Sequence, residues 1–325
     1  MPHFFKSIRI RNLLSFGPDS PELVLKPINI VIGPNGSGKS NFLAALWLLS
    51  EPGDIFDPVI PGGIEWKWNH EQQSRAFIEI ETEGKKYPCE YHVGKNYRGV
   101  LGSSDSAGKH IQSFSDLFFF RDWQYGPTAP VRSGPQPIDL SSERLRTDGR
   151  NLAHVVKRIR ENEQSNAKFM EFLTELYEDI SDVTVEEAHA YYFLYVLENE
   201  QKRRVERISD GTLRYLALLA ILCDPEPPKL ICLEEPELGL HPDLIHVIAK
   251  AIRYASERTQ IIATTHSVSL VDDFTDMPES IVVCEKIDGS TELRRLDLEE
   301  MAPFLAKRHR LGELWTSGLI GGNRW

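Results

Sequence analysis

The segment INIVIGPNGSGKS runs from Ile28 to Ser40. Its apolar first part, Ile28–Ile32, predicts a short strand buried on both faces, as in a parallel sheet. Three glycines follow, and we expect a helix from Lys39 to about Leu49. Such a loop turns tightly and directs its N–H groups at an anion, which the positive end of the helix also attracts. A chance glycine-rich turn, the alternative, accounts for neither the strand nor the helix.

The loop matches the pattern G-x-x-x-x-G-K-[ST]. In this pattern the lysine reaches the β- and γ-phosphates of a nucleotide, and the final hydroxyl ligates Mg²⁺. Lys39 and Ser40 are the residues expected to do so. The candidate nucleotide-binding residues are Gly33, Pro34, Asn35, Gly36, Ser37, Gly38, Lys39, Ser40 and Asn41.

A second stretch, LICLEEPELGLHP from Leu230 to Pro242, ends an apolar strand in adjacent carboxylates. Burying such a pair is unfavourable unless a cation offsets the charge. Glu234 would hold a magnesium ion through its water shell. Glu235 would orient the attacking water and act as its general base. The alternative is a strand that simply ends at the surface.

The stretch ISDGTLRYLALLAIL begins at Ile208 and predicts a buried helix, with Ser209 and Gly211 at its start. A serine and a glycine amide at a helix N-terminus form an anion site. The Lys39 loop already holds a nucleotide, so a second phosphate site is surplus within one subunit. It makes sense if it caps the γ-phosphate bound by another subunit. An ordinary helix cap is the alternative.

A further apolar strand, within IIATTHS from Ile261 to Ser267, ends in Thr264, Thr265 and His266. His266 could contact the γ-phosphate or the attacking water, although a polar strand end would look the same. From Leu230 onward strands and helices alternate. This alternation predicts a parallel sheet covered by helices.

The composition of the 325 residues, 41% hydrophobic and 26% charged, is that of a soluble globular protein. A net charge of −11 argues against a surface that is basic all over. We see neither a bilayer-spanning run nor a signal pattern, so we expect a cytoplasmic protein without membrane contact. The four cysteines are scattered, which predicts reduced core residues.

The order GPNGSGKS, ISDGT, LICLEEPELGLHP and TTHS resembles the ATP-binding-cassette (ABC) superfamily. Within it the chain is similar to the RecF and structural-maintenance-of-chromosomes (SMC) branch, and more narrowly to OLD-related ATPases of the AAA_21 and AAA_15 types. The opening strand IRIRNLLSFG supports this branch. The resemblance covers Phe5 to about Glu285. It implies an α/β head with a mostly parallel core sheet flanked by helices, an antiparallel β lobe and a small helical insertion.

The resemblance also implies a division into domains. Residues 1–140 and 205–325 would form the ATPase head, and residues 141–204 a helical and β insertion acting as a lever. Within the insertion we expect two helices over Asn151–Ile180, separated by a polar break and too short for a long coiled coil. No acidic cluster like that of a fused Toprim nuclease follows His266, so an effector would be encoded separately.

The resemblance implies a role for each residue of this sequence that matches one of the family's motifs. Lys39, Glu235 and His266 would be catalytic, with His266 as the switch histidine. Magnesium would be held by Ser40, Glu234 and Gln124, the last as a candidate glutamine loop. The signature acting on the other subunit would comprise Ser209, Asp210, Gly211 and Thr212, and Pro236–His241 would touch that subunit. Two departures are Glu234 in place of aspartate, and Asp210 and Thr212 in place of the transporter form Gly-Gly-Gln.

The resemblance implies an ATPase, with ATP and Mg²⁺ as cofactors, whose heads pair as a dimer or higher homo-oligomer around ATP. We expect a switch in DNA repair or anti-phage defence, working with a separate nuclease or toxin. DNA is a candidate ligand because basic residues cluster, although a salt-bridged face would look the same. The clusters are Arg144, Arg146, Arg150, Lys157, Arg158 and Arg160, then Lys202, Arg203, Arg204 and Arg207. The alternatives are a protein scaffold that holds an effector without DNA and, with less support, a transporter subunit.

Overall fold

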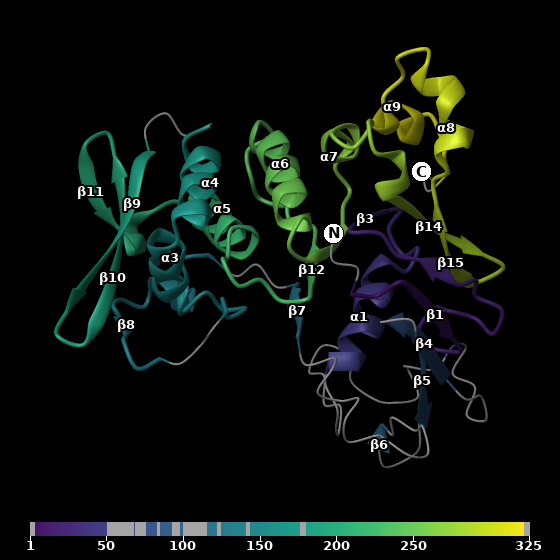
Figure 1. Cartoon of the computed structure of the whole chain (residues 1–325), viewed down its shortest axis with the longest axis horizontal. Helices are drawn as coiled ribbons and strands as arrows, with labels where there is room; N and C mark the ends of the chain where they lie inside the picture. The colour runs from purple at the N-terminus through teal and green to yellow at the C-terminus, as the bar shows by residue number, and fades with distance from the viewer. Residues whose placement is uncertain are drawn as a thin grey trace. The chain divides into compact units, whose positions relative to one another are not determined.

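The computed structural model describes residues 4–50, 68, 76–82, 85–92, 98–99, 116–121, 125–140, 144–175 and 180–321. The chain forms two compact units (Figure 1). The first comprises Met1–Phe119, Pro228–Glu235 and Thr259–Trp325, and the second comprises Phe120–Pro227 and Pro236–Arg258. The division into head and lever rests on the resemblance and stays a prediction.

The first unit contains a six-stranded sheet in the order β15-β14-β3-β13-β12-β7. Strands β12, β13, β3 and β14 are parallel, and β15 pairs antiparallel with β14. Every residue of β3 and β13 is buried, which confirms the prediction of a central parallel sheet. The strands are β3 (Ile28–Ile32), β7 (Leu117–Phe120), β12 (Leu230–Glu234), β13 (Gln260–Thr264), β14 (Ile281–Ile287) and β15 (Ser290–Arg295).

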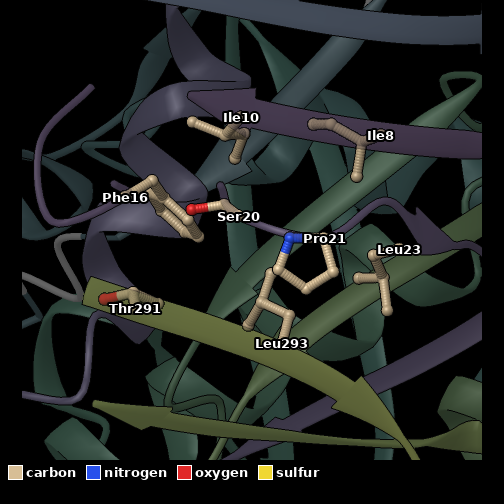
Figure 2. Close-up of a pocket in the computed structure, with 8 residues that line it drawn as sticks. All are labelled: Ile8, Ile10, Phe16, Ser20, Pro21, Leu23, Thr291 and Leu293. Carbon is tan, nitrogen blue, oxygen red and sulfur yellow. The ribbon is translucent and has the colours of Figure 1, made fainter. Parts of the chain in front are cut away.

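An antiparallel lobe completes the core of this unit. Its order is β2-β1-β4-β5-β6, with β1 (Ser7–Arg11), β2 (Leu23–Val24), β4 (Ala76–Thr82), β5 (Lys85–His92) and β6 (Arg98–Gly99). The buried residues of β1 and β4 form one hydrophobic core with those of α1 (Lys39–Ser50). A cavity of about 10 Å³ beside β1 and β15 is lined by mostly apolar side chains (Figure 2). It has room for at most one water molecule.

The C-terminal part of the first unit is helical. It contains α7 (Val268–Asp272), the 3₁₀ turn η5 (Pro278–Ser280), α8 (Leu298–Leu305) and α9 (Leu311–Thr316). Asp272 Oδ1 accepts a hydrogen bond of 2.7 Å from Gly312 N at the start of α9. A Cβ on Gly312 would lie 2.6 Å from Val268 O, so glycine allows α9 to approach α7 closely.

The second unit combines helices with a small antiparallel sheet (Figure 1). Its central strand, β10, pairs with β8, β9 and β11. Helix α5 is buried from Thr212 to Leu222, as its apolar sequence predicts. The elements are η3 (Pro130–Arg132), β8 (Gln136–Pro137), α3 (Leu152–Glu161), α4 (Glu163–Thr174), β9 (Ile180–Ala188), β10 (Tyr191–Glu198), β11 (Gln201–Arg204), η4 (Val205–Arg207), α5 (Asp210–Leu222) and α6 (Leu244–Ser256).

Two details of this unit differ from the sequence prediction. The polar break was expected near Glu161–Asn166, but only Asn162 separates α3 from α4. Asn162 ends one helix and caps the next by accepting a hydrogen bond from Ser165 N at 3.0 Å. Ile180 begins strand β9 and does not end a helix. In the sequence, Ile180 continues the apolar spacing of the preceding helix. In the structure, its side chain is buried as part of strand β9.

Two expectations drawn from the composition concern the cysteines and membrane-spanning segments. All four thiols are free and buried, as predicted. Burial raises the pKa of Cys89 to about 12 and that of Cys284 to about 11, so both thiols stay protonated near neutral pH. Within the described ranges, each helix is too short or too polar to cross a bilayer.

Candidate nucleotide-binding site

The loop between β3 and α1 is shaped by its glycines. Gly33 has φ +156°, and a Cβ there would lie 2.2 Å from Cys284 O. Gly38 has φ +114°, and a Cβ there would lie 2.1 Å from Thr291 Oγ1. Since real Cβ contacts are never this short, both positions require glycine. The loop therefore follows the neighbouring strands closely and has the strand–loop–helix form of a phosphate cradle.

Lys39 turns back over this loop. Its Nζ donates to Gly33 O at 2.8 Å and to Pro34 O at 3.1 Å. Burial lowers the pKa of Lys39, and the acidic side chains of Glu235 and Glu234 oppose that shift. A desolvated ammonium within a glycine loop is chemically matched to an anionic phosphate.

Ser40 and Glu234 fit a magnesium ion. Ser40 Oγ donates a hydrogen bond to Glu234 Oε1, so the second residue of α1 meets the last residue of β12. A hydroxyl and a carboxylate are the hard oxygen ligands that Mg²⁺ prefers. No group of three or more His, Cys, Asp or Glu side chains suited to a metal exists among the described residues. Magnesium would therefore take its remaining ligands from nucleotide and water, as is usual for this ion.

Glu235 and His266 face each other beyond the end of β12. Glu235 N donates to Thr264 O at 3.0 Å, and Glu235 Oε1 lies 3.6 Å from His266 Nε2. Burial lowers the pKa of His266 and the charge of Lys39 lowers it further, whereas Glu235 raises it. The lowered pKa favours the neutral imidazole, which can both donate and accept hydrogen bonds. The parallel pairing of β12 with β13 brings these groups to one sheet edge.

Glu235 holds a backbone conformation that costs stability. Its φ of +46° is left-handed, which costs a residue with a Cβ on the order of 1–2 kcal/mol. We expect Glu235→Gly to raise the free energy of unfolding by about 1 kcal/mol, since glycine adopts this φ without strain. Denaturant titration would measure this gain. Glu235→Gln keeps the Cβ and should show no gain in the free energy of unfolding. Equal stability of the two variants would contradict the claim that the backbone of Glu235 is strained.

A network behind the loop was not apparent from the sequence. Thr291 Oγ1 lies 2.7 Å from both Ser37 O and Ser15 Oγ, and Thr291 N donates to Ser15 O at 2.7 Å. Asn41 Nδ2 donates to the same Ser15 Oγ at 2.8 Å. Asn41 was predicted to bind nucleotide, and its amide makes this bracing contact. The only sequence signal was the serine in the opening strand motif, because the contacts of Thr291 span almost the whole chain.

We expect Thr291→Val to weaken ATP binding about tenfold. Valine keeps the shape of threonine but leaves the buried Ser37 carbonyl without its hydrogen-bond donor. Losing this hydrogen bond costs on the order of 1–3 kcal/mol. Part of this cost lowers the stability of the fold, and part lowers the order of the phosphate loop. Calorimetric titration with ATP would measure the affinity. Thr291→Ser retains the hydroxyl and serves as the control. Equal ATP affinity of the valine and serine variants would show that the brace has no influence on the loop.

The predicted signature residues lie together in the second unit. Ser209 caps α5, with its Oγ accepting from Thr212 N at 3.1 Å and lying 2.7 Å from Thr212 Oγ1. Asp210 is the first residue of the helix. A Cβ built on Gly211 would lie 3.4 Å from Gly239 O, so the Pro236–His241 loop packs on the same helix start. Gln124 lies outside the described residues.

The basic clusters are largely ion-paired with carboxylates of the same unit. Such pairs add little stability, but each carboxylate offsets part of the local positive charge. The pairs within 4 Å are Arg146 and Arg150 with Asp148, Lys157 with Glu161, Arg158 with Asp224, Arg160 with Asp182, Lys202 with Glu186, Arg203 with Glu198, and Arg204 with Glu206.

The fold of the chain is that of the head domains of SMC proteins. A solved SMC head, bound to the C-winged helix domain of ScpA, is similar with a TM-score of 0.66 at 14% identity, over 92% of this chain and 99% of that one. The SMC head with an extended coiled coil derived from Pyrococcus furiosus is similar with a TM-score of 0.64 at 13% identity, over 94% of this chain and 99% of that one.

Residues 28–272 match the AAA_21 family, described as "AAA domain, putative AbiEii toxin, Type IV TA system", and the chain belongs to this family. The Old nuclease of Escherichia phage P2 is 23% identical over 87% of this chain and 60% of its own length. The chromosome partition protein Smc of Fusobacterium nucleatum is 23% identical over 62% of this chain and 20% of its own length. The chain thus spans less than two thirds of either relative.

Proposed function

We propose that the chain binds Mg·ATP on the Gly33–Asn41 loop and hydrolyses it to ADP and phosphate. The observation that carries this proposal is the convergence of Ser40, Glu234, Glu235 and His266 at the loop within one unit. Lys39 would hold the β- and γ-phosphates, and Ser40 and Glu234 would hold the ion. Glu235 would accept a proton from the attacking water, oriented with the help of neutral His266.

Two copies would close on two ATP molecules, each held by Lys39 of one copy and capped by Ser209 of the other. The capped start of α5 supports this arrangement, since its N–H groups and dipole suit a phosphate. Charge-assisted hydrogen bonds to phosphate are worth roughly 1.5–3 kcal/mol each. Several of them could hold a weak dimer that separates once the γ-phosphate is lost.

The test combines phosphate release with light scattering on the purified chain. Mg·ATP should support turnover and produce a dimer, whereas ADP should leave a monomer. EDTA, which removes the ion, is the control and should abolish turnover. A chain that neither turns over ATP nor changes its mass with ATP would contradict the proposal.

The cellular role we propose is a cytoplasmic switch in DNA repair or anti-phage defence that works with a separately encoded nuclease or toxin. Two printed names support this role: one relative is called Old nuclease, and the description of the family includes a putative AbiEii toxin. Purification of the chain from its own cells, with and without ATP, tests it. A nuclease or toxin that co-purifies in an ATP-dependent manner is the expected result. Exclusive association with a membrane permease would instead support a transporter subunit, which the Asp210–Thr212 form of the signature disfavours.

A second candidate is an ATP-dependent scaffold that holds an effector without DNA, and the pairing of the basic clusters favours it. A protein that neutralises several phosphates with free cations loses affinity steeply with salt. With most of the clustered arginines and lysines already paired, the chain should bind duplex DNA only weakly near 150 mM salt. Fluorescence anisotropy across a salt series would measure this. Tight binding with a steep salt slope would favour DNA over the scaffold.

A further inference from the structure

The signature carries a negative charge where an anion is expected. Asp210 directly follows the capping residue Ser209, and its side chain is 59% exposed. A carboxylate this close would repel the γ-phosphate of another copy. The proposed trans site therefore needs a neighbouring cation that cancels this charge.

Arg132, at the end of η3, supplies such a cation. Its side chain is only 9% exposed, and its Nη2 lies 2.5 Å from Asp210 Oδ1. The other guanidinium nitrogens donate to main-chain carbonyls: Nη1 to Ile208 O at 2.7 Å and to Glu206 O at 3.2 Å, and Nε to Tyr125 O at 3.1 Å. One guanidinium thus binds the residues on both sides of Ser209.

This contact set suits arginine in particular. The guanidinium is planar, always charged and offers several fixed donors, whereas a lysine presents one mobile ammonium. Holding Ile208 O fixes the chain as it enters Ser209, and the ion pair with Asp210 fixes the first residue of α5. Both effects act on the backbone whose N–H groups would receive the phosphate.

We propose that Arg132 is a positioning residue of the signature, which neutralises Asp210 and orients the start of α5 for the phosphate bound by another copy. The inference rests on the proposed ATP-sandwiched dimer. It assigns no contact between Arg132 and the nucleotide. Without Arg132, the charge of Asp210 would be unbalanced and would oppose closure of the dimer.

The test measures ATP-dependent dimerisation of the full chain by light scattering across a salt series. Arg132→Met keeps an unbranched stem but removes the guanidinium and its charge, and should weaken dimerisation about tenfold or more, since uncompensated like charges at an interface are strongly unfavourable. Adding Asp210→Asn should restore much of the loss, and so should raised salt, which screens the repulsion. ATP affinity of the monomer, measured by calorimetry, should change less than about twofold.

Ser209→Arg is the benchmark, because it blocks the trans site directly. If Ser209→Arg still dimerises with ATP, the proposed sandwich itself is wrong. If Ser209→Arg fails to dimerise while Arg132→Met behaves as the unmodified chain, only the role of Arg132 is overturned. A loss in Arg132→Met that neither Asp210→Asn nor salt relieves would also overturn it.

Thermal unfolding shows whether Arg132→Met folds. Should it not fold, Arg132→Lys carries the test, because lysine keeps the charge and loses only the fork. Because lysine keeps a charge opposite Asp210, Arg132→Lys should dimerise close to the unmodified chain, and any loss should return in raised salt or with the added Asp210→Asn. A loss of dimerisation that neither change relieves would overturn the inference.

Discussion

Glu235→Gln should lower the rate of ATP hydrolysis at least 100-fold while leaving the ATP-bound dimer intact. Glutamine has the same shape but cannot accept the proton of the attacking water, and a positioned general base contributes roughly 10²–10⁴-fold. The left-handed backbone at position 235 and its bond to Thr264 do not depend on the carboxylate. Nucleotide should therefore bind normally and accumulate between the two copies.

The measurement pairs single-turnover hydrolysis with light scattering in ATP. Glu299→Gln, which removes an exposed carboxylate at the start of α8, is the matched control and should hydrolyse ATP as the unmodified chain does. The pairing of Glu235 with His266 predicts that His266→Ala also slows turnover, but less than loss of the base. A Glu235→Gln chain that remains monomeric and hydrolyses ATP at the original rate would exclude Glu235 as the base.

Local patterns predicted the central part of the fold correctly. The strand Ile28–Ile32, the glycine loop and the helix from Lys39 are neighbours in sequence, so their apolar spacing and turn residues suffice. The same holds for β12 and β13, whose apolar runs end in polar groups. Parallel strands end at one sheet edge, which is why Glu235 and His266 could be expected to lie together.

Contacts between distant segments could not be predicted in this way. Thr291 braces Ser37 through hydrogen bonds that depend on how β15 returns beside the loop, and no local pattern marks it. Arg132 lies in the stretch APVRSGPQP, whose prolines favour irregular structure and do not mark a site. The left-handed backbone of Glu235 is also invisible in sequence, because glutamate carries no preference for it. The proposed reacting groups could therefore be named from local sequence patterns, whereas the contacts that support them depend on the fold.

Lys39→Met should weaken ATP binding without lowering the stability of the nucleotide-free chain. The ammonium would make charge-assisted hydrogen bonds to phosphate, each worth roughly 1.5–3 kcal/mol, so its loss should weaken ATP binding about 10- to 150-fold. Without nucleotide the same ammonium is desolvated, and burial lowers its pKa. A lowered pKa means that the protonated lysine opposes folding at neutral pH, and methionine removes this opposition. The nucleotide-free variant should therefore be at least as stable as the unmodified chain.

Calorimetry with ATP and denaturant titration without it would measure the two effects. Lys39→Arg retains a charge that cannot be lost on burial, and should lose affinity through misfit while gaining no stability. Unchanged ATP affinity in Lys39→Met would remove Lys39 from the proposed site. A large fall in stability without nucleotide would instead show that the bonds to Gly33 O and Pro34 O hold the loop together. In that case Lys39 would mainly stabilise the loop, and its buried ammonium would not be evidence for a phosphate-binding role.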